Sequence, residues 1–153
     1  MAWLTALMVV LMVTVVVLRY AFDQGAIPIQ EAIVYLHATV IMLGIPCALR
    51  DGVHVRVDIL HSRLSERARG IIDVAGHLLF LVPTCLLILY FSIPYARNAW
   101  LVLEGSPEVG GIPAVFLLKT LIPVMAVALL LQGLAETVRR LPIILPSHFG
   151  SER

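Results

Sequence analysis

Residues 27–49 read IPIQEAIVYLHATVIMLGIPCAL, and this stretch decides the class of fold. The hydrocarbon core of a bilayer is about 30 Å thick, and an α-helix rising about 1.5 Å per residue needs about 20 apolar residues to cross it. The stretch is long enough and carries a single charged residue, Glu31. Pro28 suits the first turn of a helix, and Glu31 lies near the positive end of its dipole. The stretch therefore predicts a membrane-spanning helix.

Three further apolar runs are long enough to span a membrane, at residues 2–20, 71–95 and 113–135. The chain has 153 residues, of which 60% are hydrophobic and 14% charged, whereas soluble domains are roughly 45–50% apolar and about 25% charged. We therefore predict an all-α integral membrane protein with four transmembrane helices in one domain, residues 1–153. The first run has no basic residue ahead of it and no small-residue cleavage site, so we expect it to be a retained span.

The positions of the basic residues predict the orientation, because cytoplasmic loops are enriched in Lys and Arg. Eight arginines lie between the second and third spans or after the fourth: Arg50, Arg56, Arg63, Arg67, Arg69, Arg139, Arg140 and Arg153. The opposite side has Arg19 and Arg97, and Lys119 lies within the fourth run. Both termini are therefore predicted to be cytoplasmic. The formal net charge is +1, and nothing indicates a nucleic-acid partner.

The two longest connections have different compositions. Residues 50–70, RDGVHVRVDILHSRLSERARG, mix arginines with aliphatic residues, which is typical of an amphipathic segment along the lipid headgroups. A solvated basic loop that only sets the topology is an equal alternative. Ser65 and Glu66 resemble the start of a helix. Residues 104–113, EGSPEVGGIP, are rich in Gly and Pro and predict an external loop.

Several residues inside the spans carry local predictions. Helix kinks are expected at Pro83, Pro94 and Pro123. Cys47 and Cys85 lie in apolar runs and are expected to act as small packing residues. Close helix approach, either within the bundle or to a partner, is expected at the small residues Gly44, Ala48, Gly76 and Gly133.

Three ionisable positions have competing interpretations. Asp73 and His77 are four residues apart and share a helix face, which favours a local hydrogen-bonded pair over a proton relay. Lys119 is expected to extend outward to Glu104 or Glu108 rather than to bind a substrate anion. Glu31 is expected either to bond another helix or subunit or only to stabilise the helix dipole.

The stretch GIPCALRDGVHVRVDIL, residues 44–60, resembles the signature of the small membrane subunit, DctQ-type, of tripartite ATP-independent periplasmic (TRAP) transporters. His54, Arg56 and Asp58 match the motif, and Arg50 and Gly52 match it less strictly. Further similarity lies in VVLRYAF with Arg19, in the placement of Glu31, in SPEVGGIP with Gly110, Gly111 and Pro113, in KTLIP with Lys119, and in LQGLAE.

This resemblance implies a sodium-coupled uptake system of the bacterial inner membrane. A periplasmic solute-binding protein, DctP-type, would deliver an organic anion to a large membrane subunit, DctM-type, which moves it. The present chain would be the smaller, non-translocating scaffold subunit, with no cofactor, no metal and no enzymatic activity. In the motif, Asp58 is predicted to pair with Arg50 or Arg56, and His54 to fix the turn into the interfacial segment.

Two other function classes are open to a chain of this kind. A haem-binding membrane anchor would use His37 and His77, but their depths differ by about 9 Å at about 1.5 Å per residue, which disfavours ligation of one iron. A metal-dependent membrane enzyme would use His54, Asp58 and His61, but the surrounding arginines disfavour a divalent cation.

Overall fold

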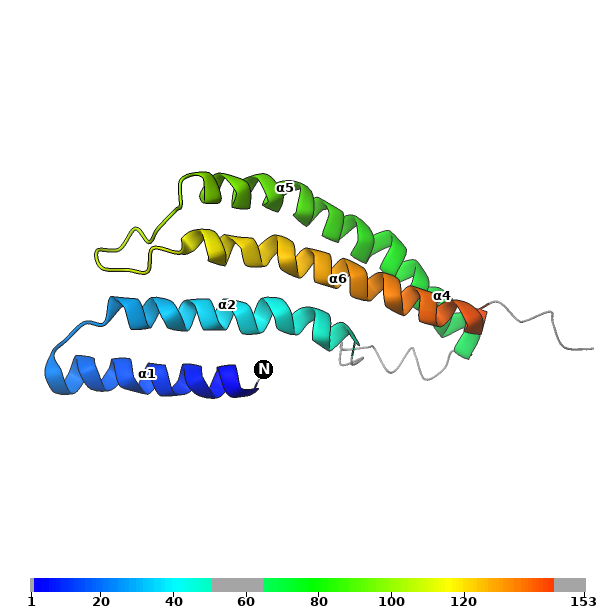
Figure 1. The fold of residues 1–153 in the computed structure, drawn as a ribbon. Helices are drawn as coiled ribbons and strands as arrows, with labels where there is room; N and C mark the ends of the chain where they lie inside the picture. Colours follow the sequence, from blue (N-terminus) through cyan, green and yellow to red (C-terminus); the bar gives the residue numbers. More distant parts are fainter. Residues whose placement is uncertain (1, 51–64, 145–153) are drawn as a thin grey trace, which may run out of the picture.

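The structure is a computed structural model that describes residues 2–50 and 65–144 (Figure 1). Its elements are α1 (Ala2–Phe22), α2 (Ile27–Arg50), α4 (Glu66–Gly76), the π-helix η1 (His77–Leu81), α5 (Val82–Leu101) and α6 (Val115–Ile144). Four helical stretches are long and apolar enough to cross a membrane: Ala2–Phe22, Ile27–Arg50, Ala68–Leu101 and Val115–Pro142. The predictions of an all-helical chain and of four candidate spans are confirmed for the described residues.

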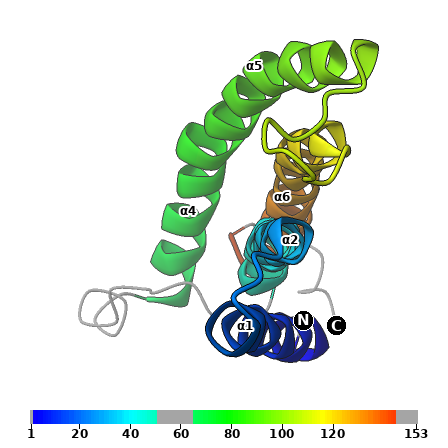
Figure 2. The ribbon, with the colours of Figure 1, turned by 90° about the vertical axis from the view of Figure 1, so that its left-hand side faces the viewer.

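The helices lie side by side in one open layer rather than in a closed bundle (Figures 1 and 2). α1 packs along α2, α2 along α6, and α6 along α5, while α4 continues beside the far end of α6. Within residues 2–50 and 65–144, no other helix packs extensively along α1. An open layer is compatible with a bilayer, because lipid gives apolar helices no hydrophobic reason to close on one another. Most large apolar side chains of the spans are accordingly exposed.

Small residues line the contact between α5 and α6. Cys85, Ser92, Ala96 and Ala99 are the buried residues of α5, and their spacing of seven, four and three residues places them on one face. Small side chains let two backbones approach closely, which is the usual source of attraction between helices in lipid. Cys85 is therefore a packing residue, as predicted. Cys47 is exposed instead, and both cysteines are free.

Gly133 confirms one of the expected close approaches. A Cβ atom at this buried position would lie 2.5 Å from Cδ2 of Leu81, so the absence of a side chain lets η1 pack against α6. Gly44 and Gly76 have nothing within 4 Å of the corresponding point, so they make no such close approach to the described helices. Their use in contact with a partner stays a prediction.

The third span is longer than predicted. The helical stretch Ala68–Leu101 has 34 residues, or about 51 Å, against a hydrocarbon core of about 30 Å. Its first part, α4, carries arginines and Asp73, so it is polar enough to extend beyond the core. Ser65 is the N-cap and its side chain accepts from the Ala68 N–H at 3.3 Å, as its sequence context predicts. The fourth span also continues past residue 135, to Ile144.

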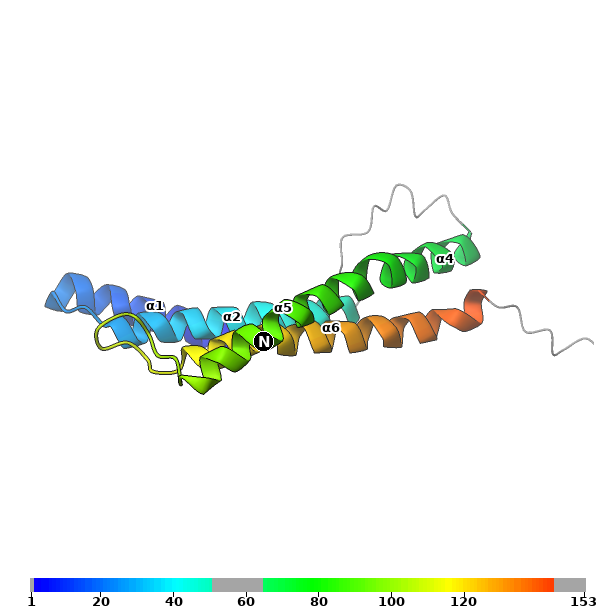
Figure 3. The ribbon, with the colours of Figure 1, turned by 90° about the horizontal axis from the view of Figure 1, so that it is seen from above.

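The helix irregularity at Pro83 is a π-helical turn. The N–H of Val82 bonds to the carbonyl of His77, five residues back, instead of the usual four. Proline has no N–H and its ring clashes with the carbonyl four residues earlier, so widening the turn before Pro83 relieves the conflict. Pro94 and Pro123 lie inside helices that continue past them. The helical stretch made of α4, η1 and α5 curves and crosses α6 obliquely (Figures 2 and 3).

α1 and α5 run opposite to α2 and α6 (Figure 1). The α1–α2 connection and the loop of residues 102–114 therefore lie at one end of the layer, which we call the loop end. The start of α1 and the end of α6 point toward the other end. The predicted interfacial segment falls mostly on residues 51–64 and lies outside the described residues.

Candidate functional site

Glu31 holds the loop of residues 102–114 to α2. Its carboxylate accepts the backbone N–H of Ile112 at 2.5 Å and the hydroxyl of Ser106. The Ser106 hydroxyl oxygen in turn accepts the N–H of Glu108 at 3.1 Å. These bonds join residues 75 and 81 positions apart in the chain. Glu31 thus bonds the loop between α5 and α6, a partner that the sequence did not predict, so its role is more than stabilisation of the helix dipole.

Gly111 is required by the same contact. A Cβ atom there would lie 2.6 Å from Oε1 of Glu31 and equally close to Cβ of Ser106. Its neighbour Gly110 has a φ of +82°, which side-chain-bearing residues rarely adopt. Gly111 is therefore needed because a side chain has no space there, and Gly110 because of its backbone conformation. We call Glu31, Ser106, Gly111 and Ile112 the Glu31 cluster.

Gly111→Ala is expected to lower the free energy of unfolding by about 1–3 kcal/mol, the usual cost of overpacking. Unfolding of the purified subunit by SDS in mixed micelles measures the effect. Gly25→Ala is the matched control, because the added Cβ would meet nothing within 4 Å. Its effect should stay within about 0.5 kcal/mol, as at ordinary surface sites. Equal stability of the two variants would show that the close packing at Gly111 is not needed.

Lys119 closes the base of the same loop. Its Nζ lies 2.7 Å from Oε1 of Glu104 and 4.2 Å from the centroid of the Tyr95 ring. The ammonium is thus held by a carboxylate and an aromatic face, one on the loop and one on α5. The prediction that Lys119 extends to a loop glutamate is confirmed for Glu104.

Trp100 and α6 form an aromatic contact beside this ion pair. The indole Nε1–H of Trp100 donates to Oγ1 of Thr120 at 2.8 Å, and its ring packs edge to face on Phe116 with centroids 4.5 Å apart. Tryptophan favours the boundary between hydrocarbon and headgroups. The loop end therefore combines an interfacial aromatic contact with polar bonds that hold the loop in place.

The loop exposes apolar side chains on its outer surface. Val109 is 92% exposed at the tip, and Leu103 is 65% exposed at the start of the loop with a positive φ. Pro107, Glu108 and Pro113 are also exposed. A firmly held loop with a protruding apolar tip is suited to contact with another protein, because little conformational entropy is lost on binding.

A second polar cluster joins α4 to α6 at the opposite end. Arg140 lies 2.9 Å from Asp73 and 3.2 Å from Glu136. The hydroxyl of Thr137 lies 3.5 Å from Nδ1 of His77. Both members of the suggested Asp73 and His77 pair thus have partners on α6. These contacts join α4 and η1 to the last part of α6.

The structure brings five of the predicted site residues to the loop end: Glu31, Gly110, Gly111, Pro113 and Lys119. Arg19 is exposed in the last turn of α1, near the same end, and Arg50 is the last residue of α2. Gly52, His54, Arg56 and Asp58 lie outside the described residues, as does His61. Sequence reasoning missed Ser106, Trp100 and Thr120, although the Ser-Pro pair at position 106 signals a turn.

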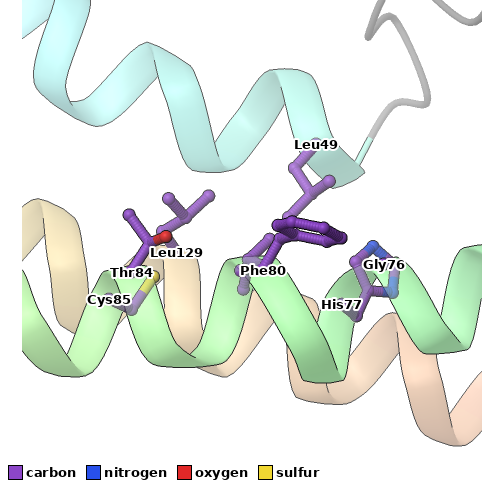
Figure 4. A pocket seen from close by; sticks show the side chains of 8 residues that line it. Leu49, Gly76, His77, Phe80, Thr84, Cys85 and Leu129 are labelled. Carbon is purple, nitrogen blue, oxygen red and sulfur yellow. The ribbon is translucent and has the colours of Figure 1, made fainter.

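The haem alternative gains no support from the structure. His37 lies with α1 residues in an apolar hollow between α1 and α2. His77 faces α6 and borders a different hollow, shared with Leu49 of α2 and Phe80, Cys85 and others (Figure 4). The imidazole of His37 therefore lies between α1 and α2, whereas that of His77 lies beside α6, and the two do not share a site. Within residues 2–50 and 65–144, no group of three or more His, Cys, Asp or Glu side chains could hold a metal ion.

Four apolar helices, polar contacts gathered at their ends and a fastened loop define a multi-pass membrane component. Residues 8–142 match the family of tripartite ATP-independent periplasmic transporters, DctQ component. The match covers most of the chain, which therefore belongs to the DctQ family, the small membrane subunits of TRAP transporters. This is a family of transporter components and not of enzymes. No curated protein matches the chain in the comparison.

Proposed function

We propose that the chain is the non-translocating scaffold subunit of a sodium-coupled TRAP transporter for an organic anion such as a carboxylate. It packs against the large DctM-type subunit in the bacterial inner membrane, with both termini cytoplasmic. Its loop end faces the periplasm and aids docking of the DctP-type solute-binding protein. The family implies both partners, and the arginine distribution supports the orientation.

The observation that carries the proposal is the open layer of apolar helices. A translocation site needs polar groups or broken helices near the midplane to replace water around its substrate. The hollows in the described spans are instead lined almost wholly by apolar side chains. Charged pairs such as Lys119 with Glu104 and Asp73 with Arg140 lie toward the helix ends. Exposed apolar faces on a thin layer suit a support for a larger membrane protein.

The docking role of the loop is supported by its construction. The Glu31 cluster and Lys119 hold both ends of the loop, so the exposed Val109 is presented on a firm base. Glu108 beside it adds a charge that can select a partner. We expect the solute-binding protein to contact this tip.

Assembly is tested by comparing the heat stability of the purified subunit with that of its complex with the large subunit. A partner that binds only the folded form stabilises it, by about 2.7 kcal/mol when its concentration is 100 times Kd. The melting temperature of this chain should therefore rise in the complex. Vesicles that contain only this chain should accumulate no solute. Equal melting temperatures, or uptake by this chain alone, would contradict the scaffold role.

A further inference from the structure

The imidazole of His37 is exposed in the middle of a span. His37 lies ten residues after the first residue of α2, or about 15 Å along a helix about 36 Å long. Its depth therefore places the imidazole near the centre of a hydrocarbon core about 30 Å thick. Among residues 2–50 and 65–144, no other His, Asp, Glu, Lys or Arg side chain is both exposed and more than two turns inside a span.

The surroundings of His37 offer its ring no polar partner. It borders a hollow whose other walls are Met8, Val9 and Met12 of α1 and Ile33 and Val34 of α2. In the described part of the chain, no hydrogen bond or ion pair involves the imidazole. An imidazole in hydrocarbon with both nitrogens unbonded loses the hydrogen bonds it makes in water, at a substantial free-energy cost. Such residues in membrane helices almost always face other protein or a water-filled cavity.

His37 belongs to one continuous exposed stripe of α2. Gln30, Val34 and Ile41 are also exposed and lie seven and three residues before it and four residues after it, so all four share a helix face. The sides of α2 next to this stripe are covered by α1 and α6. The stripe and the adjoining hollow form one surface, which we call the His37 face. Most of its area is apolar, with one hydrogen-bonding group near its centre.

We propose that the His37 face seats a transmembrane helix of the large subunit, which bonds the imidazole through a hydroxyl, carboxamide or carboxylate group and fills the hollow with an apolar side chain. The inference rests on the proposed function and adds to it the face that meets the partner. In the middle of its span, α5 exposes the hydroxyl groups of Thr84 and Tyr90 but no imidazole, carboxylate, ammonium or guanidinium group. Lipid chains cannot bond His37 at this depth. The imidazole therefore distinguishes this face from the others.

The test uses the small and large subunits co-purified in nanodiscs. A photoreactive p-benzoylphenylalanine is placed at Val34 or Ile41, which flank His37. The matched control position is Phe91, which is 65% exposed on α5 and, like His37, ten residues from the loop end of its helix. Cross-links to the large subunit from Val34 and Ile41 support the proposal. Cross-links to it from Phe91 alone, or only lipid adducts at Val34 and Ile41, overturn it.

Substitutions of His37 give a second readout in the intact complex. Polar contacts between membrane helices average about 0.6 kcal/mol and reach about 1.7 kcal/mol. The apolar His37→Phe should therefore raise the Kd for the large subunit about 3- to 20-fold, whereas His37→Gln, which can still hydrogen-bond, should stay within about 2-fold. An unchanged Kd for His37→Phe overturns the proposal. If the unsubstituted chain does not bind the large subunit, the proposed function fails and this inference falls with it.

Discussion

Glu31→Ala is expected to raise the hydrogen-exchange rate of the Ile112 amide by roughly 10- to 100-fold, because hydrogen bonds to charged groups contribute about 1.5–3 kcal/mol. The substitution removes the acceptor of both the Ile112 N–H and the Ser106 hydroxyl. No other hydrogen bond among the described residues ties this loop to α2. Exchange measured by mass spectrometry on the purified subunit would report the release of the loop.

The matched control for this prediction is Glu108→Ala. Glu108 has the same charge as Glu31, lies on the same loop as Ile112 and has an exposed side chain. Its removal should leave the exchange of the Ile112 amide unchanged. Glu31→Gln should give an intermediate rate, because the amide keeps one acceptor oxygen for the two donors. Equal exchange in Glu31→Ala and Glu108→Ala would mean that the loop is held by its own backbone bonds and not by α2.

Hydropathy predicted the number of spans, because a run of about 20 apolar residues has the length of a helix that crosses the hydrocarbon core. It predicted the ends less well. Residues 66–70 carry charges and have the composition of a connection, yet they are helical as part of α4. The same holds after residue 135, where α6 continues through Glu136 and Arg140. The two polar helix ends pair with each other through Asp73 and Arg140. Such pairing depends on tertiary structure and leaves no local signal.

In the candidate site, too, local contacts could be predicted from the sequence and contacts between distant residues could not. The contact between Lys119 and Glu104 joins residues 15 positions apart across one short loop, so a long side chain near the helix start predicts it. The contact between Glu31 and Ile112 joins residues 81 positions apart and depends on α2 lying beside α6. Sequence left the role of Glu31 open for this reason. The exposure of His37 likewise could not be predicted, because it depends on the helices forming an open layer. The spacing of apolar residues along one helix carries no information on that arrangement.

The ion pair between Asp73 and Arg140 is expected to stabilise the junction of α4 and α6. The two side chains are 17% and 21% exposed, and their atoms lie 2.9 Å apart. Removing one partner of a fully buried pair costs about 3–5 kcal/mol, and partial exposure reduces this to about 1–3 kcal/mol here. Asp73→Ala and Arg140→Ala should each lower the free energy of unfolding by this amount in mixed micelles. Asp73→Ala leaves Arg140 with Glu136 as a carboxylate partner, whereas Arg140→Ala removes a cation that both Asp73 and Glu136 contact.

The double variant Asp73→Ala/Arg140→Ala measures the interaction energy between the two side chains apart from their other contacts. If the two residues act through each other, the combined loss should be smaller than the sum of the single losses by about 0.5–2 kcal/mol, as for residues in direct contact. Arg139→Ala is the control, because Arg139 is 66% exposed and lies 4.0 Å from Glu136, a geometry that contributes at most about 1 kcal/mol. Strict additivity of the two single losses would contradict the pairing. In that case the junction would depend on the neighbouring contacts of Thr137 with His77 and of Arg140 with Glu136.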